Sequence, residues 1–431
     1  MMKISEMPKY QTYKDSTEGW IGDVPEHWDI RKLKHLFYEK KHRPNMSLNC
    51  GAISFGKVVT KDDEKILLST KASYQEVLSG EFLINPLNLN YDLISLRIAL
   101  SEVDVVVSAG YIVIREKEEL QKQYFKYLLH RYDVAYMKLL GSGVRQTISF
   151  NHIANSLLVF PPLEEQSLIA AFLDKKTALI DEAISIKEKQ INLLKERKQI
   201  IIQQAVTQGL DPNVPMKDSG VDWIGKIPAH WEVKKMKFIF DSIQTGTTPV
   251  TSEPKYFDGD VDWYNPKDLN AGYLDKSEKT ISELAIKHGQ AKIFPGDSVL
   301  IVGIGATCGK TAYLKSSSAF NQQITGFSSR HENAEFMYYL ISMYSSVMLK
   351  VANYTTLPIL NNEFFKHFLL PCPSKIEQDR IVGFLRIETL KFEKTIEIQL
   401  QQIERLKEYK TTLINSAVTG KIKITPEMVE Q

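Results

Sequence analysis

The stretch Gly19-Trp20-Ile21-Gly22-Asp23-Val24-Pro25-Glu26-His27-Trp28 decides the organisation of this chain, because the chain repeats it. Positions 222–231 read Asp-Trp-Ile-Gly-Lys-Ile-Pro-Ala-His-Trp, so both tryptophans, the isoleucine, the glycine, the proline and the histidine recur 203 positions later (20 to 223). A period of this length indicates a duplicated domain, since the repeats of solenoid proteins are much shorter. We therefore expect each half of the chain to do the same kind of work.

A second set of residues recurs 212 positions apart and places a long helix in each half. Glu165-Gln166 returns as Glu377-Gln378, and Ala205-Val206-Thr207 returns as Ala417-Val418-Thr419. Each half opens with the tryptophan motif, continues through a basic stretch and a mixed region of short apolar runs, and ends in prolines before the helix. The expected domains are residues 1–160, a helix region 161–217, residues 218–372, and a second helix region 373–431.

Composition is compatible with a multidomain protein and excludes few functions. The chain has 431 residues, 43% of them hydrophobic, and a net charge of +2, with basic and acidic residues interspersed. This favours a local basic surface over a generally basic protein and leaves DNA binding open. Cys50, Cys308 and Cys372 show no C-x-x-C spacing, so the sequence predicts no metal site and no disulfide framework.

The sequence predicts no membrane segment. No apolar run reaches the roughly 18 residues that a membrane span requires, and the first residues, MMKISEMPKY, lack the apolar centre of a signal peptide. Together with free thiols, this predicts a cytoplasmic protein.

Both predicted helices carry an apolar stripe that advances by alternating steps of four and three, which is the pattern of a heptad seam. Members of one stripe lie 212 positions from members of the other, and the polar interruptions Thr177 and Thr389, and Lys198 and Lys410, also match. The predicted seam residues are Leu173, Ile180, Ile184, Ile191, Leu194, Ile201, Leu385, Phe392, Ile396, Ile403, Leu406 and Leu413.

An amphipathic helix packed on its own domain would also show a helical period. Matching polar interruptions are better explained if the two helices pack on each other, and we then expect Leu194 and Leu406 to be buried. From Leu173 to Ala205 such a helix would span about 48 Å at about 1.5 Å per residue, so it would act as a spacer.

Motifs that suggest catalysis are incomplete. Gly303 to Thr311 resembles a phosphate-binding loop, but the glycine required five positions before Gly309 is Ile304. Asn265-Pro266 lacks the second proline and aromatic residue of an amino-methyltransferase pocket. His27 and His230 are expected to be buried histidines that orient the tryptophan-rich turns. The sequence predicts no catalytic residue.

Basic and amide side chains remain as candidates for contacts with DNA. Lysine and arginine bind phosphates, arginine also reads guanine, and asparagine or glutamine reads adenine. Each such residue, taken singly, is more often ordinary solvated surface. The candidates are Lys40, Lys41, Arg43, Arg145, Gln146, Lys255, Lys310, Asn321 and Gln322.

The duplicated W-I-G-x-[VI]-P-x-H-W motif, the Glu-Gln pair before each long helix and Ala-Val-Thr near its end together resemble the specificity (S) subunits of type I restriction-modification systems. The resemblance covers nearly the whole chain. It implies an α+β fold with two mixed α/β target recognition domains, separated by two long helices that pair antiparallel as a coiled coil with pseudo-two-fold symmetry.

The resemblance also implies a function. Each domain would read one half of a bipartite asymmetric site in double-stranded DNA, and the helices would set the spacing and dock two methyltransferase (M) subunits and, through them, restriction (R) subunits. S-adenosylmethionine, ATP and Mg would be bound by those partners. Two alternatives remain: a stand-alone methyltransferase-nuclease with an unrecognised active site, and a coiled-coil scaffold that does not bind DNA.

Overall fold

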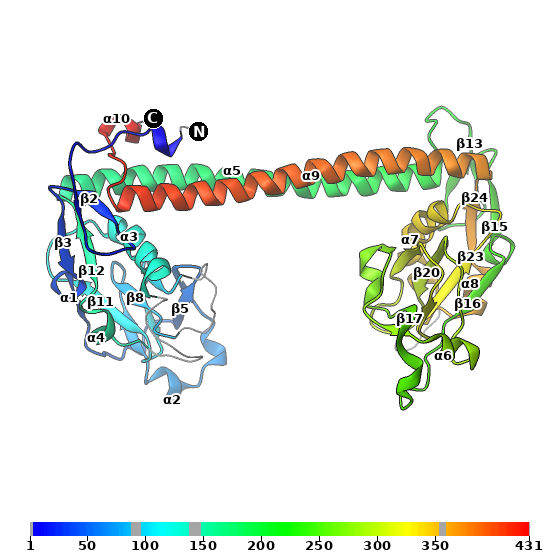
Figure 1. Cartoon of the computed structure of the whole chain (residues 1–431), viewed down its shortest axis with the longest axis horizontal. Helices are drawn as coiled ribbons and strands as arrows, with labels where there is room; N and C mark the ends of the chain where they lie inside the picture. Colours follow the sequence, from blue (N-terminus) through cyan, green and yellow to red (C-terminus); the bar gives the residue numbers. More distant parts are fainter. Residues whose placement is uncertain (1–2, 88–95, 138–147, 353–358, 431) are drawn as a thin grey trace. The chain divides into compact units, whose positions relative to one another are not determined.

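The computed structural model describes residues 3–87, 96–137, 148–352 and 359–430 (Figure 1). The chain divides into two compact units. The first comprises Met1–Glu188 with Leu400–Gln431, and the second comprises Lys189–Gln399. Each unit contains one mixed α/β module and part of each long helix, so the expected duplication is present in the fold.

The module of the first unit is built around a four-stranded antiparallel sheet in the order β4-β11-β8-β9. The buried residues of β8 and β11 are apolar, and α3 packs against β9. The strands are β1 Tyr13–Asp15, β2 Asp23–Pro25, β3 Asp29–Lys32, β4 Phe37–Glu39, β5 Gly51–Ser54, β6 Lys57–Thr60, β7 Gln75–Val77, β8 Phe82–Ile84, β9 Ile98–Leu100, β10 Val105–Val107, β11 Ile112–Glu116 and β12 Leu157–Phe160. The short helices are α1 Leu33–Leu36, α2 Leu68–Lys71, α3 Lys122–Ala135 and α4 Phe150–Ile153.

The module of the second unit has a five-stranded sheet in the order β16-β23-β20-β21-β18, with α7 packed against β20 and β21. All residues of β20 (Ser298–Val302) are buried. The strands are β13 Met216–Asp218, β14 Lys226–Pro228, β15 Glu232–Lys235, β16 Ser242–Thr245, β17 Phe257–Tyr264, β18 Tyr273–Leu274, β19 Thr280–Ile281, β20 Ser298–Val302, β21 Thr311–Leu314, β22 Ala319–Phe320, β23 Ile324–Ser328 and β24 Leu369–Cys372. The helices are α6 Glu283–Lys287, α7 Ala334–Val351 and α8 Asn362–His367.

Two long helices run through both units, α5 over Leu163–Gln208 and α9 over Lys375–Val418 (Figure 1). In the first unit, the Lys410 ammonium lies 2.6 Å from the Asp181 carboxylate, and Lys187 donates a hydrogen bond to Gln402. In the second unit, Lys198 pairs with Glu393 at 2.7 Å. As the residue numbers rise along α5, those of its partners on α9 fall, so the two helices are antiparallel.

These ion pairs explain the polar interruptions of the seam. Lys198 and Lys410 occupy equivalent positions, and so do their partners Glu393 and Asp181, because each pair of equivalent residues is 212 positions apart. The duplicated contact fixes the same register at both places, as polar groups within a coiled-coil seam do.

The residues of the predicted seam are not uniformly buried. Buried members are Leu173, Ile180, Ile191, Leu385, Ile403 and Leu413, and half-buried members are Ile184, Leu194, Ile201, Phe392, Ile396 and Leu406. The expectation that Leu194 and Leu406 would be buried was wrong. Leu173, Ile180 and Leu413 belong to the core of the first unit and Leu385 to that of the second, whereas Ile191 and Ile403 are buried outside those cores.

This difference predicts unequal effects on stability. Leu385 belongs to the core of the second unit and is fully buried, so Leu385→Ala should cost about 2–5 kcal/mol of unfolding free energy. Leu194→Ala should cost clearly less, because its side chain already contacts solvent. Urea unfolding of the two variants measures this. Equal losses would show that Leu194 is packed as tightly as Leu385.

The end of each long helix contacts a module. The Ala417 and Val418 side chains are fully buried, and the Tyr124 hydroxyl of α3 donates a hydrogen bond to the Val418 carbonyl at 2.9 Å. Gly420 follows with φ of 73°, and a Cβ there would stand 2.3 Å from Cδ of Pro25. The Ala-Val-Thr repeat is therefore the place where α9 joins the first module. Ala205 and Val206 are buried in the core of the second unit in the same way.

The chain limits of the modules follow from strand pairing. β12 ends at Phe160 and pairs with β3, after which α5 begins at Leu163. β13 pairs with β14, so residues 216–218 already belong to the second module. After α9, the chain returns to the first module, where the short helix α10 (Pro426–Glu430) ends the described residues.

Candidate nucleic-acid interface

The duplicated motifs meet at the beginning of each long helix. In the first unit the Glu165 carboxylate accepts hydrogen bonds from the Tyr10 hydroxyl at 2.6 Å and from the Trp28 indole at 3.0 Å, and it lies 2.6 Å from Nε2 of His27. In the second unit Glu377 contacts Nε2 of His230 at 2.8 Å and the Trp231 indole at 3.0 Å. The tryptophan motif and the Glu-Gln motif are thus two halves of one anchor.

The histidines of this anchor differ from expectation. Trp28 and Trp231 are fully buried, but the side chains of His27 and His230 are about half exposed, at 48% and 52%. The prediction that both histidines are buried was wrong, because each glutamate lies at the module surface and draws its histidine there. Their role is the expected one of holding the turn.

The glutamine of each Glu-Gln pair joins the helix to the module a second time. Gln166 accepts a hydrogen bond from the backbone N–H of Gln121, which caps α3, and donates one to the Pro161 carbonyl. Gln378 makes the equivalent bonds with the backbone N–H of Asn333 and the Pro373 carbonyl. Each module is therefore held on a long helix by the same buried polar contacts, which fix its orientation on that helix.

The charge of Glu165 contributes to the anchor. Burial alone would raise the pKa of this carboxyl, but hydrogen bonds from Tyr10, His27 and Trp28 outweigh burial and hold the pKa below its ordinary value. Because the pKa of Glu165 is lower in the folded state than in the unfolded state, this carboxylate stabilises the fold at pH values above its unfolded-state pKa. The contribution is lost as the pH falls through the folded-state pKa.

Glu165→Gln tests this contribution. An amide offers one acceptor oxygen instead of two and brings its own donors towards Tyr10 and Trp28, so we expect a loss of about 1–3 kcal/mol at pH 7. The difference from the unsubstituted protein should shrink below about pH 4.3, the ordinary pKa of glutamate. Urea unfolding at several pH values measures both effects. The exposed neighbour offers a matched control, Glu164→Gln, and an equal loss there would contradict the assignment.

In the second module, three strand ends bring amide and hydroxyl side chains together. The backbone N–H of Asn321, after β22, donates to the carbonyl of Tyr264 at the end of β17 at 3.1 Å. The backbone N–H of Thr247, after β16, donates to the carbonyl of Phe320 at 2.9 Å. Gly246 is required at this crossing, because a Cβ there would lie 2.1 Å from the Phe320 oxygen. We call the resulting group the amide cluster; it comprises Thr247, Thr248, Asn265, Asn321, Gln322 and Gln323.

Within the amide cluster, Asn321 and Gln322 have different environments. The side chain of Asn321 is buried, accepts a hydrogen bond from the backbone N–H of Gln323 at 3.0 Å and donates to the Gln323 side chain at 3.3 Å. Gln322 is exposed and bonded to the Thr248 hydroxyl. Asn321 therefore shapes the turn, and Gln322 is presented at the surface.

Two further members of the cluster were not among the sequence-based candidates. Nδ2 of Asn265 and the hydroxyl of Thr247 are buried, and neither has a hydrogen-bond partner within the described residues. Unpaired buried polar atoms are costly and are common where a ligand completes the site. Asn265 was visible only as part of an incomplete methyltransferase motif, and Thr247 had no signal of its own, because the strand ends that unite them are far apart in sequence.

The glycine-rich loop lies beside this cluster. It connects β20 to β21, and the backbone N–H of Gly303 donates to the Gln323 carbonyl at 2.7 Å. A phosphate-binding loop of the nucleotide type leads from a strand into a helix, whereas this loop leads into a second antiparallel strand. Nζ of Lys310 lies 2.6 Å from the Asn270 side chain. Lys255 is exposed and pairs with Glu253 at 2.9 Å.

The candidates of the first module are less uniform. Lys40 is only 13% exposed and lies 2.9 Å from Glu81 and 3.3 Å from Glu76, so its charge is balanced within the module. Lys41 is exposed, and Arg43 is largely exposed, 3.9 Å from Glu76. Arg145 and Gln146 lie outside the described residues.

No metal-ligand cluster and no helix able to cross a membrane occur in the described ranges. The three cysteines are free thiols, two of them buried. The candidate residues within the described ranges carry amide, hydroxyl, ammonium or guanidinium groups, which suit hydrogen bonding and phosphate contact.

Comparison with known proteins agrees with this architecture. The profile of the type I restriction modification DNA specificity domain matches residues 25–196 and again residues 228–408. The MjaIX specificity subunit of Methanocaldococcus jannaschii is 33% identical over 168 residues, 38% of each chain. The MjaX specificity subunit of that organism, named as putative, is 23% identical and aligns over 98% of this chain and all of its own length.

Solved structures show the same fold. A chain from a study of complex assembly and conformational transition of the type I R-M system superposes with a TM-score of 0.69 at 15% identity, covering 92% of this chain and 98% of that one. The HsdS subunit from Thermoanaerobacter tengcongensis gives a TM-score of 0.53 at 16% identity, over 93% and 98% of the two chains.

Two DNA specificity domains, each anchored on a long helix, define a specificity subunit of a type I restriction-modification system. The chain belongs to this family, and both the resemblance and the fold expected from the sequence are confirmed. Its class supplies DNA sequence recognition and is not itself the enzyme.

Proposed function

We propose that each module reads one half of a bipartite, asymmetric site in double-stranded DNA. The observation that supports this is the duplicated anchor, in which Glu165 and Glu377 hold two modules in the same way on two antiparallel helices. The two anchors are alike, but the modules that they hold are different. One module contains a four-stranded sheet and the other a five-stranded sheet. Modules with different surfaces read different sequences, so the two half-sites differ.

The helices set the gap between the half-sites in this proposal. Because α5 and α9 both pass from one unit into the other and share a duplicated ion pair, their length is a fixed property of the protein. Half-site spacing follows such geometry in other DNA-binding proteins.

Partner subunits would bind to the sides of the helices that the seam leaves open. Large aliphatic side chains are exposed on α5 at seven-residue intervals, which places them along one face: Leu179, Ile186, Leu193 and Ile200. On α9 the exposed aliphatic residues are Ile387, Leu390, Ile398 and Leu400. Exposed apolar stripes of this kind mark protein–protein contacts. One surface on each helix suits two methyltransferase subunits, which would in turn carry restriction subunits.

The chemistry would then belong to the partners. We assign no cofactor to this chain and expect S-adenosylmethionine, ATP and Mg on the methyltransferase and restriction subunits, and we place the complex in the cytoplasm. A stand-alone methyltransferase-nuclease would instead modify DNA without partners, and a scaffold would not bind DNA at all. Methyl transfer by the purified chain, free of any methyltransferase subunit, would favour the first alternative.

Base readers and phosphate contacts should respond differently to substitution. Gln322→Ala removes an exposed amide from the amide cluster, so we expect a loss of about 1–3 kcal/mol of binding free energy at one half-site and relaxed specificity there. Lys41→Ala should weaken binding to every sequence and reduce the salt slope by about one.

The assay is binding of the chain, assembled with its methyltransferase subunits, to cognate and random duplexes over a range of salt concentrations. Lys40→Ala offers a comparison for Lys41→Ala, because the charge of Lys40 is already balanced by Glu76 and Glu81. Equal losses on cognate and random DNA for Gln322→Ala would refute its assignment as a reader.

A further inference from the structure

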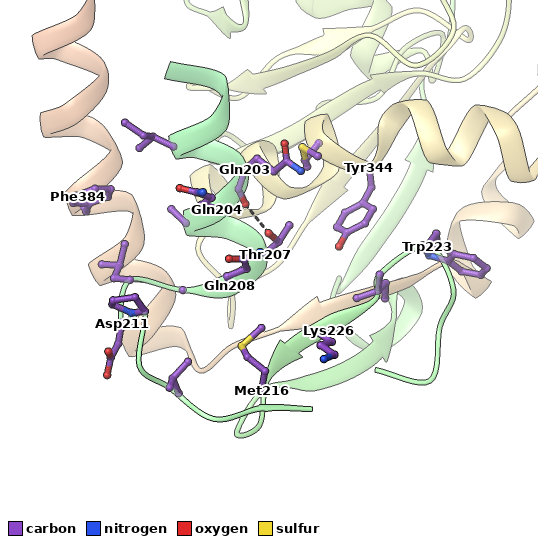
Figure 2. A pocket seen from close by; sticks show the side chains of 18 of the residues that line it. Gln203, Gln204, Thr207, Gln208, Asp211, Met216, Trp223, Lys226, Tyr344 and Phe384 are labelled. Carbon is purple, nitrogen blue, oxygen red and sulfur yellow. Dashed lines mark hydrogen bonds between the residues drawn. The ribbon is translucent and has the colours of Figure 1, made fainter. Parts of the chain in front are cut away.

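The second unit contains a groove that the proposed function does not use. It has a volume of about 800 Å³ and lies between the last turns of α5, the following loop 209–216 and α7 (Figure 2). Gln203, Gln204 and Gln208 border it on α5, Tyr344 lies opposite, and Phe384 of α9 reaches its edge. This volume corresponds to on the order of 25 water molecules, which is far larger than a packing defect.

In the first unit, the residues equivalent to those that line the groove are buried. Met7 and Leu210 are equivalent positions of the 203-residue repeat, yet Met7 is 7% exposed and Leu210 is 42% exposed. Phe172 and Phe384 are equivalent in the 212-residue repeat, with exposures of 1% and 38%. Apolar side chains at equivalent positions are core residues in one unit and surface residues in the other.

The tryptophan motif shows the same difference. Trp20 and Ile21 are buried in the first unit, whereas Trp223 and Ile224 are only half buried and line the groove. The neighbours of the two tryptophans differ, because Trp20 lies against Tyr132 and Tyr136 of the first module, whereas Trp223 stacks on Phe368. Met7 and Phe172 have a further cover in the first unit.

The C-terminal segment of the chain supplies that cover. Ile422 and Ile424 are buried in the same core cluster as Met7, Trp20, Ile21 and Phe172, and Met428 and Val429 pack against it. The backbone N–H of Lys423 donates to the Pro8 carbonyl at 2.8 Å, and Nζ of Lys175 donates to the carbonyls of Val429 and Glu430 at 2.9 Å.

The second unit cannot use such a segment of its own. After α5 the chain passes within eight residues into β13, so the residues that would cover the groove are instead the link to the next module. The equivalent of Lys175 is Ile387, which is 59% exposed. The lysine that binds the C-terminal end of α10 is thus replaced by an aliphatic side chain, and this makes the second site more apolar and unsuited to the same tail.

We propose that this groove binds an extended segment of a partner protein with alternating aliphatic side chains, which completes the second unit as Ile422 and Ile424 complete the first. The partner is the methyltransferase subunit, so the inference rests on the proposed function. The segment lies between α5 and α7, places its aliphatic side chains on Leu210, Trp223 and Phe384, and continues to Ile387. The amides of Gln203, Gln204 and Gln208 bind its main chain.

A photo-crosslinking amino acid at position 210, and separately at position 384, tests this in the full chain co-expressed with its methyltransferase subunit. We expect both positions to crosslink to that subunit, at one stretch with aliphatic residues at every second position. The matched control is position 238, because Phe238 is also an exposed aromatic residue of the second unit, at 72%, but does not line the groove. It should give no crosslink to that stretch.

Substitution provides an independent measurement. Leu210→Glu and Phe384→Glu should each weaken association with the methyltransferase subunit at least tenfold, and Phe238→Glu should leave it unchanged. The altered residues are exposed in the isolated chain, so its thermal unfolding should not change. A complex that assembles with undiminished affinity while positions 210 and 384 give no crosslink would overturn the groove inference and leave the proposed function standing. Absence of any complex would overturn both, and a crosslink to the tail of a second copy of this chain would overturn the assigned partner.

Discussion

Exchanging residues 38–160 for the same region of a related specificity subunit should change one half of the recognised site and leave the other half and the gap intact. The exchanged region contains the sheet β4-β11-β8-β9 and α3. It leaves in place Tyr10, His27, Trp28 and Glu165, the residues of the first anchor. The new module would therefore be held in the orientation of the old one.

Methylation mapping across the genome, in cells that carry the variant with its methyltransferase subunit, measures this outcome. The reciprocal exchange in the second module, from β16 to α8, should change only the other half-site. It would remove the amide cluster with Gln322 and would keep His230, Trp231 and Glu377. If either exchange altered both half-sites, the modules would not read DNA independently.

The repeats in the sequence predicted the parts of the fold that depend on local pattern. Heptad spacing predicted a contact face on α5 and α9, and the matched positions of Lys198 and Lys410 correspond to equivalent ion pairs between the helices. The exposure of Leu194 was not predictable in this way, because the pattern shows which side chains face a partner helix and not how many layers cover them.

Long-range polar contacts were beyond sequence reasoning. The tryptophan and Glu-Gln motifs were both recognised, but their union through Glu165, Trp28 and Tyr10 joins residues more than 130 positions apart. The sequence predicted only part of the amide cluster. Gln322 belongs to a run of consecutive amide residues, whereas Asn265 and Thr247 follow other strands. Ile422 and Ile424 pack in the core of the first unit, but the only sequence signal for this contact is a short alternation of aliphatic residues.

The same contacts change how the spacing of half-sites must be tested. Lengthening α5 alone would break its register with α9, since Lys410 could not meet Asp181 while Lys198 still met Glu393. The two helices must be lengthened together. A second copy of residues 182–188 after Glu188, and of residues 394–400 after Leu400, adds one heptad to each helix at opposing positions and repeats the seam residues Ile184 and Ile396.

This paired extension should lengthen the gap without changing either half-site. Seven residues add about 10 Å to a helix at about 1.5 Å per residue, which corresponds to about three base pairs at 3.4 Å each. Methylation mapping should then find both half-sites unchanged and a gap longer by up to about three base pairs. The matched control, the same heptad in α5 alone, should lose modification because the helices no longer pair. An unchanged gap in the paired extension would show that something other than α5 and α9 determines the spacing, and altered bases at unchanged spacing would show that the helices take part in reading the sequence.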